Sequence, residues 1–364
     1  MEFDRQFTHK MKIGFDAKRY YHNHTGLGNY SRTLVHGLER YCPEHERVLY
    51  DESPLHRSFS LAHQAKQDGC GLLHGLSNEI PFDAVRADIP TLVTIHDTAW
   101  RTFPAMYHAI DRQIYDFKYG WSCRHASRVL AISESTKRDV MRFYGVPEER
   151  IEVICQPVQD VFYTPVDTAT ARQTLCEALP NLPHDFCLYV GSINRRKNLL
   201  SVVQALGMFG ETERPVLVVV GNGREYRKEV EQYIAGKGLG KWVYIIDNLN
   251  DGRTLQCLYR LAMTFIYPSF YEGFGLPVVE AALQRCPVIT SNVSSLPEAA
   301  GDGALLVNPS DTGQLYDSLR RVLEDSSLAE RLGLQGEQYA RHNFDPQAQA
   351  LKVYNLYEQM LQQK

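Results

Sequence analysis

Short apolar runs alternate with helix-like segments along the whole chain, and this alternation restricts the fold more than any other feature. Strands are expected at Lys12–Asp16, Thr91–Ile95, Val129–Ile132, Ile151–Ile154, Phe186–Val190, Val216–Val220, Val243–Ile246, Thr264–Tyr267, Pro287–Thr290 and Ala304–Val307. Runs this short and this apolar suit strands that are covered on both faces. Strands that alternate with helices over such a length indicate parallel sheets built from βαβ units. The expected fold class is therefore α/β.

The alternation is interrupted once, in a proline-rich stretch between about residues 157 and 185. This stretch surrounds one short helical piece, Thr168–Ala178, and contains Pro157, Pro165, Pro180 and Pro183. Because 364 residues exceed twice the typical domain length of about 150, the interruption is interpreted as a joint between two domains. We place an N-terminal domain at residues 1–165 and a C-terminal domain at residues 166–345. Residues 346–364 are expected to form a last helix, Pro346–Gln362, that packs back on the N-terminal domain.

Composition excludes several classes of function. Thirty-nine basic and 43 acidic side chains leave a formal charge of -4, whereas proteins that bind nucleic acid usually carry a strong basic excess. No stretch approaches the roughly 18 to 20 apolar residues that cross a bilayer, and the first residues are too polar for a secretory signal. The eight cysteines are scattered and form no CxxC pair, as expected for reduced thiols. These features predict a cytoplasmic protein without a nucleic-acid partner.

The most informative stretch is Glu272–Glu280, which follows an expected strand and leads into an expected helix with Pro277 in its first turn. Gly273 and Gly275 let the backbone approach a ligand closely and leave N–H groups free. A helix N-terminus presented in this way suits a pyrophosphate. The two flanking carboxylates would repel a phosphate, so they are expected to accept hydrogen bonds from sugar hydroxyls on either side of it. The alternative is a glycine-rich turn whose Glu280, expected in the first helical turn, favours the helix dipole.

Arg196 and Lys197 follow the expected strand Phe186–Val190, at the carboxyl edge where α/β sheets bind ligands. A nucleoside diphosphate leaving group gains negative charge as a glycosidic bond breaks, and fixed cations stabilise that charge. Which of Arg195 and Arg196 turns inward stays open at this point. The alternative is a solvated basic turn.

Several ordered motifs resemble the retaining, nucleotide-sugar-dependent glycosyltransferases of family 4. They are the Glu-x7-Glu stretch, the segment Tyr189–Asn198 and the segment Ser294–Pro309. The resemblance implies the GT-B fold, in which two Rossmann-like domains have parallel sheets that face each other across a cleft. It implies that Arg196 and Lys197 bind the donor diphosphate, that Glu272 binds the hexose and that Glu280 binds the ribose. Donor contacts from the loop and the helix start are implied for Gly273, Phe274, Gly275 and Leu276.

In the N-terminal domain, the resemblance concerns two further segments. The segment Gly26–Arg32 resembles the family's glycine loop, so Gly26 and Gly28 are implied to contact the donor diphosphate. From the residues alone, a loop is expected at Thr25–Gly28 and a helix at Asn29–Tyr41. His96 follows the strand Thr91–Ile95, and the resemblance implies that it lines the sugar pocket. A tight turn and a structural histidine are the respective alternatives. Asp97 as the nucleophile of a double displacement is disfavoured, because the resemblance implies a same-face displacement.

No metal or redox cofactor is expected. No Asp-x-Asp pair occurs in the chain, so charge neutralisation would fall to Arg196, Lys197 and the helix N-terminus. His22 and His24 form an HxH pair without a convincing third ligand. Gly221-Asn222-Gly223 begins like a dinucleotide fingerprint, but Tyr226 stands where its third glycine should be, so NAD binding is not predicted.

The pattern looks most like mannosyltransferases of bacterial surface-polysaccharide assembly, which implies a hexosyltransferase with GDP-mannose as donor. A UDP-hexose such as UDP-glucose is the alternative donor, and a sugar-nucleotide epimerase or a non-catalytic sensor is the alternative function. The acceptor would be a glycan or a lipid-linked saccharide, which allows peripheral contact with the inner face of a membrane. Aromatic and cationic residues after His96 form either an acceptor pocket or a packed helix face, and they are Trp100, Arg101, Tyr107, Arg112 and Tyr115.

Overall fold

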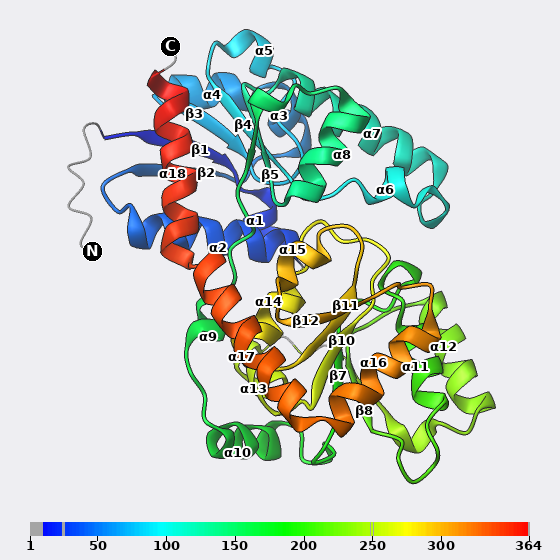
Figure 1. The fold of residues 1–364 in the computed structure, drawn as a ribbon. Helices are drawn as coiled ribbons and strands as arrows, with labels where there is room; N and C mark the ends of the chain where they lie inside the picture. Colours follow the sequence, from blue (N-terminus) through cyan, green and yellow to red (C-terminus); the bar gives the residue numbers. More distant parts are fainter. Residues whose placement is uncertain (1–9, 24–25, 248, 250, 363–364) are drawn as a thin grey trace. The chain divides into compact units, whose positions relative to one another are not determined.

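The computed structural model describes residues 10–23, 26–247, 249 and 251–362 (Figure 1). The chain divides into two compact units. Unit 1 comprises the chain up to Pro157 and again from Pro346 onward, whereas unit 2 comprises Val158–Asp345. The change from one unit to the other thus falls at Pro157, near the start of the proline-rich stretch.

Unit 1 contains one six-stranded parallel sheet in the order β2-β1-β3-β4-β5-β6 within the described residues. Its strands are β1 (Lys12–Asp16), β2 (Glu46–Tyr50), β3 (Leu72–Gly75), β4 (Thr91–Ile95), β5 (Arg128–Ala131) and β6 (Ile151–Val153). Its helices are α1 (Lys18–His22), α2 (Gly26–Tyr41), α3 (Pro54–Phe59), α4 (Leu61–Gln67), α5 (Ala84–Ala87), α6 (Ala99–Thr102), α7 (Ala109–His125), α8 (Glu134–Tyr144) and α18 (Pro346–Gln362), with short 3-10 turns at Pro104–Met106 and Glu148–Arg150.

Unit 2 contains a second parallel sheet in the order β12-β11-β10-β7-β8-β9. Its strands are β7 (Cys187–Val190), β8 (Leu217–Val220), β9 (Val243–Ile246), β10 (Thr264–Tyr267), β11 (Val288–Ser291) and β12 (Ala304–Val307). Its helices are α9 (Asp160–Tyr163), α10 (Thr168–Ala178), α11 (Leu199–Gly207), α12 (Glu225–Gly236), α13 (Gly252–Leu261), α14 (Leu276–Leu283), α15 (Leu296–Ala300), α16 (Thr312–Glu324) and α17 (Ser326–Asn343), with 3-10 turns at Arg195–Lys197 and Gly240–Trp242.

The central strands are buried on both faces, as their apolar runs predict. Every residue of β3, β4, β7, β8, β10 and β11 is buried. Each sheet has its own hydrophobic core. The helices that cover the sheet contribute the apolar side chains of one helix face to this core. The expected α/β class with two Rossmann-like sheets is confirmed.

Each sheet has one point where consecutive strands turn to opposite sides. In unit 1 the chain passes from β1 to β2 on one side and then to β3 on the other, and in unit 2 strands β8 and β10 flank β7. Open α/β sheets bind ligands beyond the carboxyl ends of the strands at such a switch point. The fold therefore marks two positions, beyond β1 and β3 in unit 1 and beyond β7 and β10 in unit 2.

The expected strands are present within one residue at each end, but β2 and β3 were not predicted. One loop expectation is wrong. Gly26 and Gly28 lie in the first turns of α2, which was expected to begin at Asn29. A Cβ atom on Gly28 would lie 1.7 Å from the Asn23 carbonyl oxygen, so the glycine lets α2 start against the preceding chain. Thr25, the first residue of the expected loop, lies outside the described residues.

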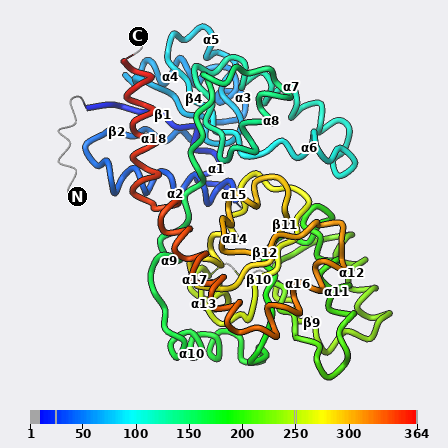
Figure 2. Tube along the Cα trace, in the orientation of Figure 1, coloured from blue at the N-terminus to red at the C-terminus, as the bar shows by residue number. Residues whose placement is uncertain are grey.

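The last helix, α18, packs against α2 within unit 1 (Figure 2). It also supplies a buried hydrogen bond, because the Tyr357 hydroxyl lies 2.7 Å from His74 Nδ1 on β3. His74 Nε2 lies 2.8 Å from the Thr94 hydroxyl on β4, which in turn lies 3.0 Å from the Tyr30 hydroxyl on α2. Burial lowers the pKa of His74 to about 3, so its ring stays neutral. Two strands and two helices are thus joined by one chain of buried polar groups.

None of the helices within the described ranges is long and apolar enough to cross a membrane.

Replacing Tyr357 by phenylalanine tests the buried chain. The change leaves His74 Nδ1 buried without its partner, and an unsatisfied buried polar atom costs about 1–3 kcal/mol. We expect Tyr357→Phe to lower the free energy of unfolding by that amount, which shifts the urea midpoint to a lower concentration. Tyr21→Phe is the matched control, because Tyr21 is exposed in the same unit, and its effect should stay within about 0.5 kcal/mol. Equal midpoints for the two variants would contradict the assignment.

Candidate functional site

The segment between β10 and α14 forms the centre of the candidate site in unit 2. Gly275 adopts a φ of +113° immediately before α14, and a Cβ atom there would lie 2.9 Å from Leu296 Cδ2. Pro277 occupies the first turn of the helix, as predicted. The sequence Gly-Phe-Gly-Leu-Pro therefore ends in a helix start at the carboxyl edge of the sheet, where backbone N–H groups are available for a ligand.

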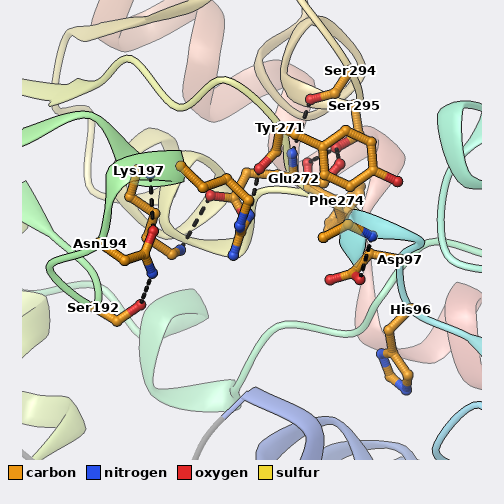
Figure 3. Close-up of polar contacts among 12 residues, drawn as sticks. His96, Asp97, Ser192, Asn194, Lys197, Tyr271, Glu272, Phe274, Ser294 and Ser295 are labelled. Atoms are coloured by element: carbon orange, nitrogen blue, oxygen red, sulfur yellow. Dashed lines mark hydrogen bonds and ion pairs between the residues drawn. The ribbon is translucent and has the colours of Figure 1, made fainter. Parts of the chain in front are cut away.

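Glu272 is the buried centre of an ion cluster (Figure 3). Its side chain lies 3.2 Å from Lys197 Nζ and 2.8 Å from an Arg196 guanidinium nitrogen, and it accepts a hydrogen bond of 3.0 Å from the Tyr267 hydroxyl. Glu272 is only 8% exposed. Burial by itself disfavours the carboxylate, but the charges of Lys197 and Arg196 outweigh this effect and lower the pKa of Glu272 to about 2. The group is therefore ionised throughout the physiological range.

A short turn after β7 aims the two cations. Asn194 caps the 3-10 turn Arg195–Lys197 by accepting a hydrogen bond from the Lys197 N–H. Asn198 follows in the left-handed region with φ +59°, and its amide donates to the carbonyls of Pro268 and Pro309 at 3.1 and 2.7 Å. These contacts tie the turn after β7 to the ends of β10 and β12.

The same turn separates the two arginines. Arg196 faces inward, where its guanidinium contacts Glu272 and also donates to the Tyr271 carbonyl. Arg195 is 66% exposed and pairs with Glu229 at 2.6 Å. The structure thus answers the question that the sequence left open, because Arg196 is the arginine that joins Lys197.

Two serines hold the loop, although no role was predicted for either of them. The Ser294 hydroxyl accepts a hydrogen bond from the Glu272 N–H at 3.0 Å. The Ser295 hydroxyl lies 2.9 Å from the Glu272 carbonyl and 2.8 Å from the Phe274 carbonyl. The only signal in the sequence was that both serines begin the segment Ser294–Pro309, which is one of the motifs that resemble the family.

Glu280 lies one turn further along α14 than expected, since the first turn of this helix contains no acidic residue. It therefore does not serve the helix dipole. Its Oε2 accepts a hydrogen bond of 3.0 Å from the Tyr259 hydroxyl. Burial raises the pKa of Glu280 to about 7, so a small change in its surroundings decides whether it is charged.

Taken together, the cluster carries two cations, one strongly acidic carboxylate and a helix start. The excess positive charge and the N–H groups can receive an anion such as a diphosphate, and fixed cations can stabilise charge that develops on it. The carboxylates of Glu272 and Glu280 can accept hydrogen bonds from hydroxyls.

In unit 1, His96 is buried after β4. Its Nε2 lies 2.9 Å from the Leu76 carbonyl, which can only accept, so Nε2 carries the proton and Nδ1 is the acceptor nitrogen. Its ring meets the ring of Tyr30 edge to face at 4.6 Å. Asp97 accepts from the Ala99 N–H at 3.1 Å and so helps to start α6. At the start of α2, the Gly28 N–H donates to the Asn23 side chain at 3.2 Å, and Gly26 would have open space around a Cβ atom.

The remaining motifs have structural explanations. Cβ atoms on Gly221 and Gly223 would lie 2.0 Å from the Gly191 carbonyl oxygen and 2.4 Å from that of Ile193, so these glycines allow two neighbouring loops to touch. His22 pairs with Asp51 at 2.9 Å, and His24 lies outside the described residues. No group of three potential metal-binding side chains occurs within the described part of the chain. Of the expected acceptor residues, Trp100 is buried and Tyr107 and Tyr115 pack partly buried against the core of unit 1, whereas Arg101 is exposed and pairs with Asp116.

Two family models match successive parts of the chain. The model for Glycosyltransferase Family 4 matches residues 26–160, and the model for Glycosyl transferases group 1 matches residues 177–339. The chain is similar to the O-antigen chain mannosyltransferase B of Escherichia coli, with 31% identity over 298 residues that cover 78% of this chain and 74% of that protein.

Solved structures share the fold. Sucrose-phosphate synthase from Thermosynechococcus elongatus aligns with a TM-score of 0.79 at 22% identity, covering 98% of this chain and 100% of that one. Anabaena HepE in complex with UDP-glucose aligns with a TM-score of 0.73 at 18% identity, covering 96% of this chain and 100% of that one. The family match, the identity to a curated relative and the two Rossmann-like units lead to one conclusion: the chain belongs to the family 4 glycosyltransferases of GT-B fold and is a hexosyltransferase that uses a nucleotide sugar.

Proposed function

We propose that the protein transfers mannose from GDP-mannose, with retention and without a metal ion, to a hydroxyl of a saccharide or lipid-linked saccharide. The observation that carries this proposal is the Lys197–Glu272–Arg196 cluster at the switch point of unit 2. Mannose is the preferred hexose because of the 31% identity to an O-antigen mannosyltransferase.

Lys197 and Arg196 stabilise the departing diphosphate. Both cations are largely buried, so their attraction for the phosphate is weakly screened by solvent. In a reaction without a strong base, leaving-group stabilisation and positioning supply most of the rate. The N–H groups around Gly273, Phe274, Gly275 and Leu276 add to this stabilisation, and the same groups make a bound divalent cation unnecessary.

Glu272 accepts hydrogen bonds from hydroxyls of the transferred hexose, and Glu280 accepts them from the ribose. Glu272 suits its role because its low pKa keeps it charged at every working pH. Glu280 suits its role because the Tyr259 hydroxyl orients its carboxylate by donating a hydrogen bond to Oε2.

For unit 1 we propose that His96 contacts the hexose through Nδ1, since Nε2 is bonded to the Leu76 carbonyl. We assign donor diphosphate contacts to Gly26 and Gly28 at the start of α2. Displacement on one face of the sugar is proposed in preference to a covalent intermediate on Asp97, whose carboxylate already serves α6.

A UDP-hexose is the second candidate donor. HepE, whose fold this chain shares, was solved with UDP-glucose. The two donors place the same diphosphate on Lys197 and Arg196 and differ only in the base and the sugar.

We also propose that a lipid-linked acceptor is met at a membrane surface, through α3 and α7. These two helices expose large apolar side chains, between 46% and 75% of each, namely Leu55, Phe59, Ile110, Ile114 and Phe117. The ring of Phe82 joins the two sets, at 5.6 Å from that of Phe59 and 6.1 Å from that of Phe117.

A panel of nucleotide sugars tests the donor. With EDTA present, GDP-mannose should raise the melting temperature and support release of GDP when an acceptor is added, whereas UDP-glucose should do neither. Lys197→Ala should lose both responses to GDP-mannose while keeping its far-UV spectrum. Responses to UDP-sugars alone would refute GDP-mannose, and activity that EDTA abolishes and Mg²⁺ restores would refute metal independence.

Replacing Glu280 by glutamine should raise the stability of the fold and lower the affinity for the donor. Because its pKa is raised to about 7, the folded wild-type protein buries a charge above that pH, which glutamine removes. We expect Glu280→Gln to be more stable by about 2–3 kcal/mol above pH 7, with the gain declining as the pH falls toward 4.5. Its KM for GDP-mannose at pH 8 should rise about tenfold, because a hydrogen bond to a charged group is lost. A pH-independent difference in melting temperature would contradict the explanation.

Vesicle flotation tests the membrane contact. The protein should float with vesicles of phosphatidylethanolamine and phosphatidylglycerol, and the double variant Ile110→Asp/Phe117→Asp should not. The matched control is Met208→Asp/Leu334→Asp, which removes exposed apolar side chains of unit 2 and should float like the wild type. Equal flotation of both double variants would refute contact through α7.

A further inference from the structure

Tyr267, the last residue of β10, contacts both signs of charge in the cluster around Glu272, although no role was predicted for it. Its hydroxyl accepts a hydrogen bond from Lys197 Nζ and donates one of 3.0 Å to Glu272 Oε1. Burial raises the pKa of Tyr267 well above its usual value, so the hydroxyl keeps the proton that it donates. One neutral group therefore connects the lysine with the carboxylate.

The Tyr267 side chain is held rigidly by the sheet. The residue is fully buried, and its ring stacks with that of Phe265 at 5.6 Å and lies 6.2 Å from that of Tyr189 on β7. Its carbonyl accepts a hydrogen bond of 2.8 Å from the Thr290 hydroxyl on β11. Because strands β7 and β11 flank β10, the packing on both sides fixes where the Tyr267 hydroxyl lies.

Lys197, in contrast, has a flexible four-carbon stem. Its backbone is fixed, since its carbonyl accepts a hydrogen bond of 3.2 Å from the Tyr189 hydroxyl. A Cβ atom on Gly191 would lie 3.2 Å from Lys197 Cδ and 3.4 Å from Tyr267 Cε2, so the glycine leaves room for the stem beside the tyrosine ring. The position of the ammonium group itself depends on the polar atoms around it, and the Tyr267 hydroxyl is a rigid one among them.

The distances within the cluster show how the tyrosine affects the pairing. Arg196 approaches Glu272 Oε2 to 2.8 Å, which is normal for a hydrogen bond between charged groups at about 2.7–2.9 Å. Lys197 Nζ stays 3.2 Å from Oε1, the oxygen that also accepts from Tyr267. The lysine is thus less closely paired with Glu272 than the arginine is.

We propose that Tyr267 is a positioning residue, whose hydroxyl holds the Lys197 ammonium beside Glu272 without full pairing, so that this cation is available to the donor diphosphate. The proposal rests on the proposed function, which gives Lys197 its diphosphate, and deepens it by naming the group that aims the lysine. A cation that is fixed in advance stabilises a phosphate without any cost of reorganisation.

A double-mutant cycle on nucleotide binding separates positioning from a structural role. GDP is titrated into the full chain by calorimetry, at millimolar GDP where binding is weak. Tyr267→Phe, which keeps the ring, should weaken GDP binding about tenfold when Lys197 is present, but less than about twofold in a Lys197→Met background. A structural role would weaken binding equally in both backgrounds. Tyr339→Phe is the matched control, because it removes a hydroxyl that donates to the Glu298 carbonyl in the same unit, and it should bind GDP like the wild type.

Equal weakening in the two backgrounds, or wild-type affinity in Tyr267→Phe, would overturn the positioning role. The crystal structure of Tyr267→Phe gives a readout without nucleotide: Lys197 Nζ should move to within about 2.9 Å of Glu272, and an unmoved ammonium would also overturn the proposal.

A parallel titration with UDP distinguishes failure of the donor assignment from failure of this inference. Tighter binding of UDP than of GDP would count against GDP-mannose, and the cycle is then measured with UDP, which carries the same diphosphate. If the wild type bound neither nucleotide, the proposed function would fail, and the position of Lys197 in the Tyr267→Phe crystal would decide whether the tyrosine aims the lysine.

Discussion

The buried ion cluster around Glu272 is the constraint on which unit 2 depends. Two cations that lie largely out of water at the edge of a sheet need a counterion even when no substrate is bound, because an uncompensated buried charge is strongly destabilising. Glu272 fills that need with one carboxylate for two cations, so the cluster stays stable and still keeps an excess of positive charge. The Asn198 amide, Ser294 and Ser295 then fix the backbone on which the three charges stand. A loose loop would let Glu272 pair fully with one cation and release the other.

The two units place charged side chains at the same topological position, but with a different balance of charge. Beyond β7 and β10, Arg196 and Lys197 outnumber Glu272, and a helix start adds N–H groups, which suits a diphosphate. Beyond β1 and β3, two carboxylates pair with two cations, so this group of charges has no excess of either sign. Net charge of the whole chain, at -4, describes neither site.

Sequence reasoning predicted those parts of the fold and of the site whose signal lies within a few neighbouring residues. Uniformly apolar strands such as β7 and β10 and the run Glu272–Glu280 carry their signal within a few residues. Strand β2 was missed because Glu46 and Arg47 break its apolar pattern at the sheet edge, and β3 was missed because it ends in His74 and Gly75. Gly26 and Gly28 indicated a loop because glycine weakens helices, but the close approach of Asn23 overrides that preference. Contacts such as Asn198 to Pro309 join residues more than a hundred positions apart, and nothing local predicts them.

The position of α18 has a consequence for the order in which the protein is made. Unit 2 lies in the chain between the two parts of unit 1, so a ribosome delivers all of unit 2 before it delivers Tyr357. Domains fold as they emerge, and unit 2 can therefore finish first, although unit 1 begins first. Before α18 is synthesised, the face of α2 that it covers is exposed. His74, on β3, then lacks the hydroxyl of Tyr357 as its hydrogen-bond partner. The first part of unit 1 therefore stays incomplete until α18 has been synthesised.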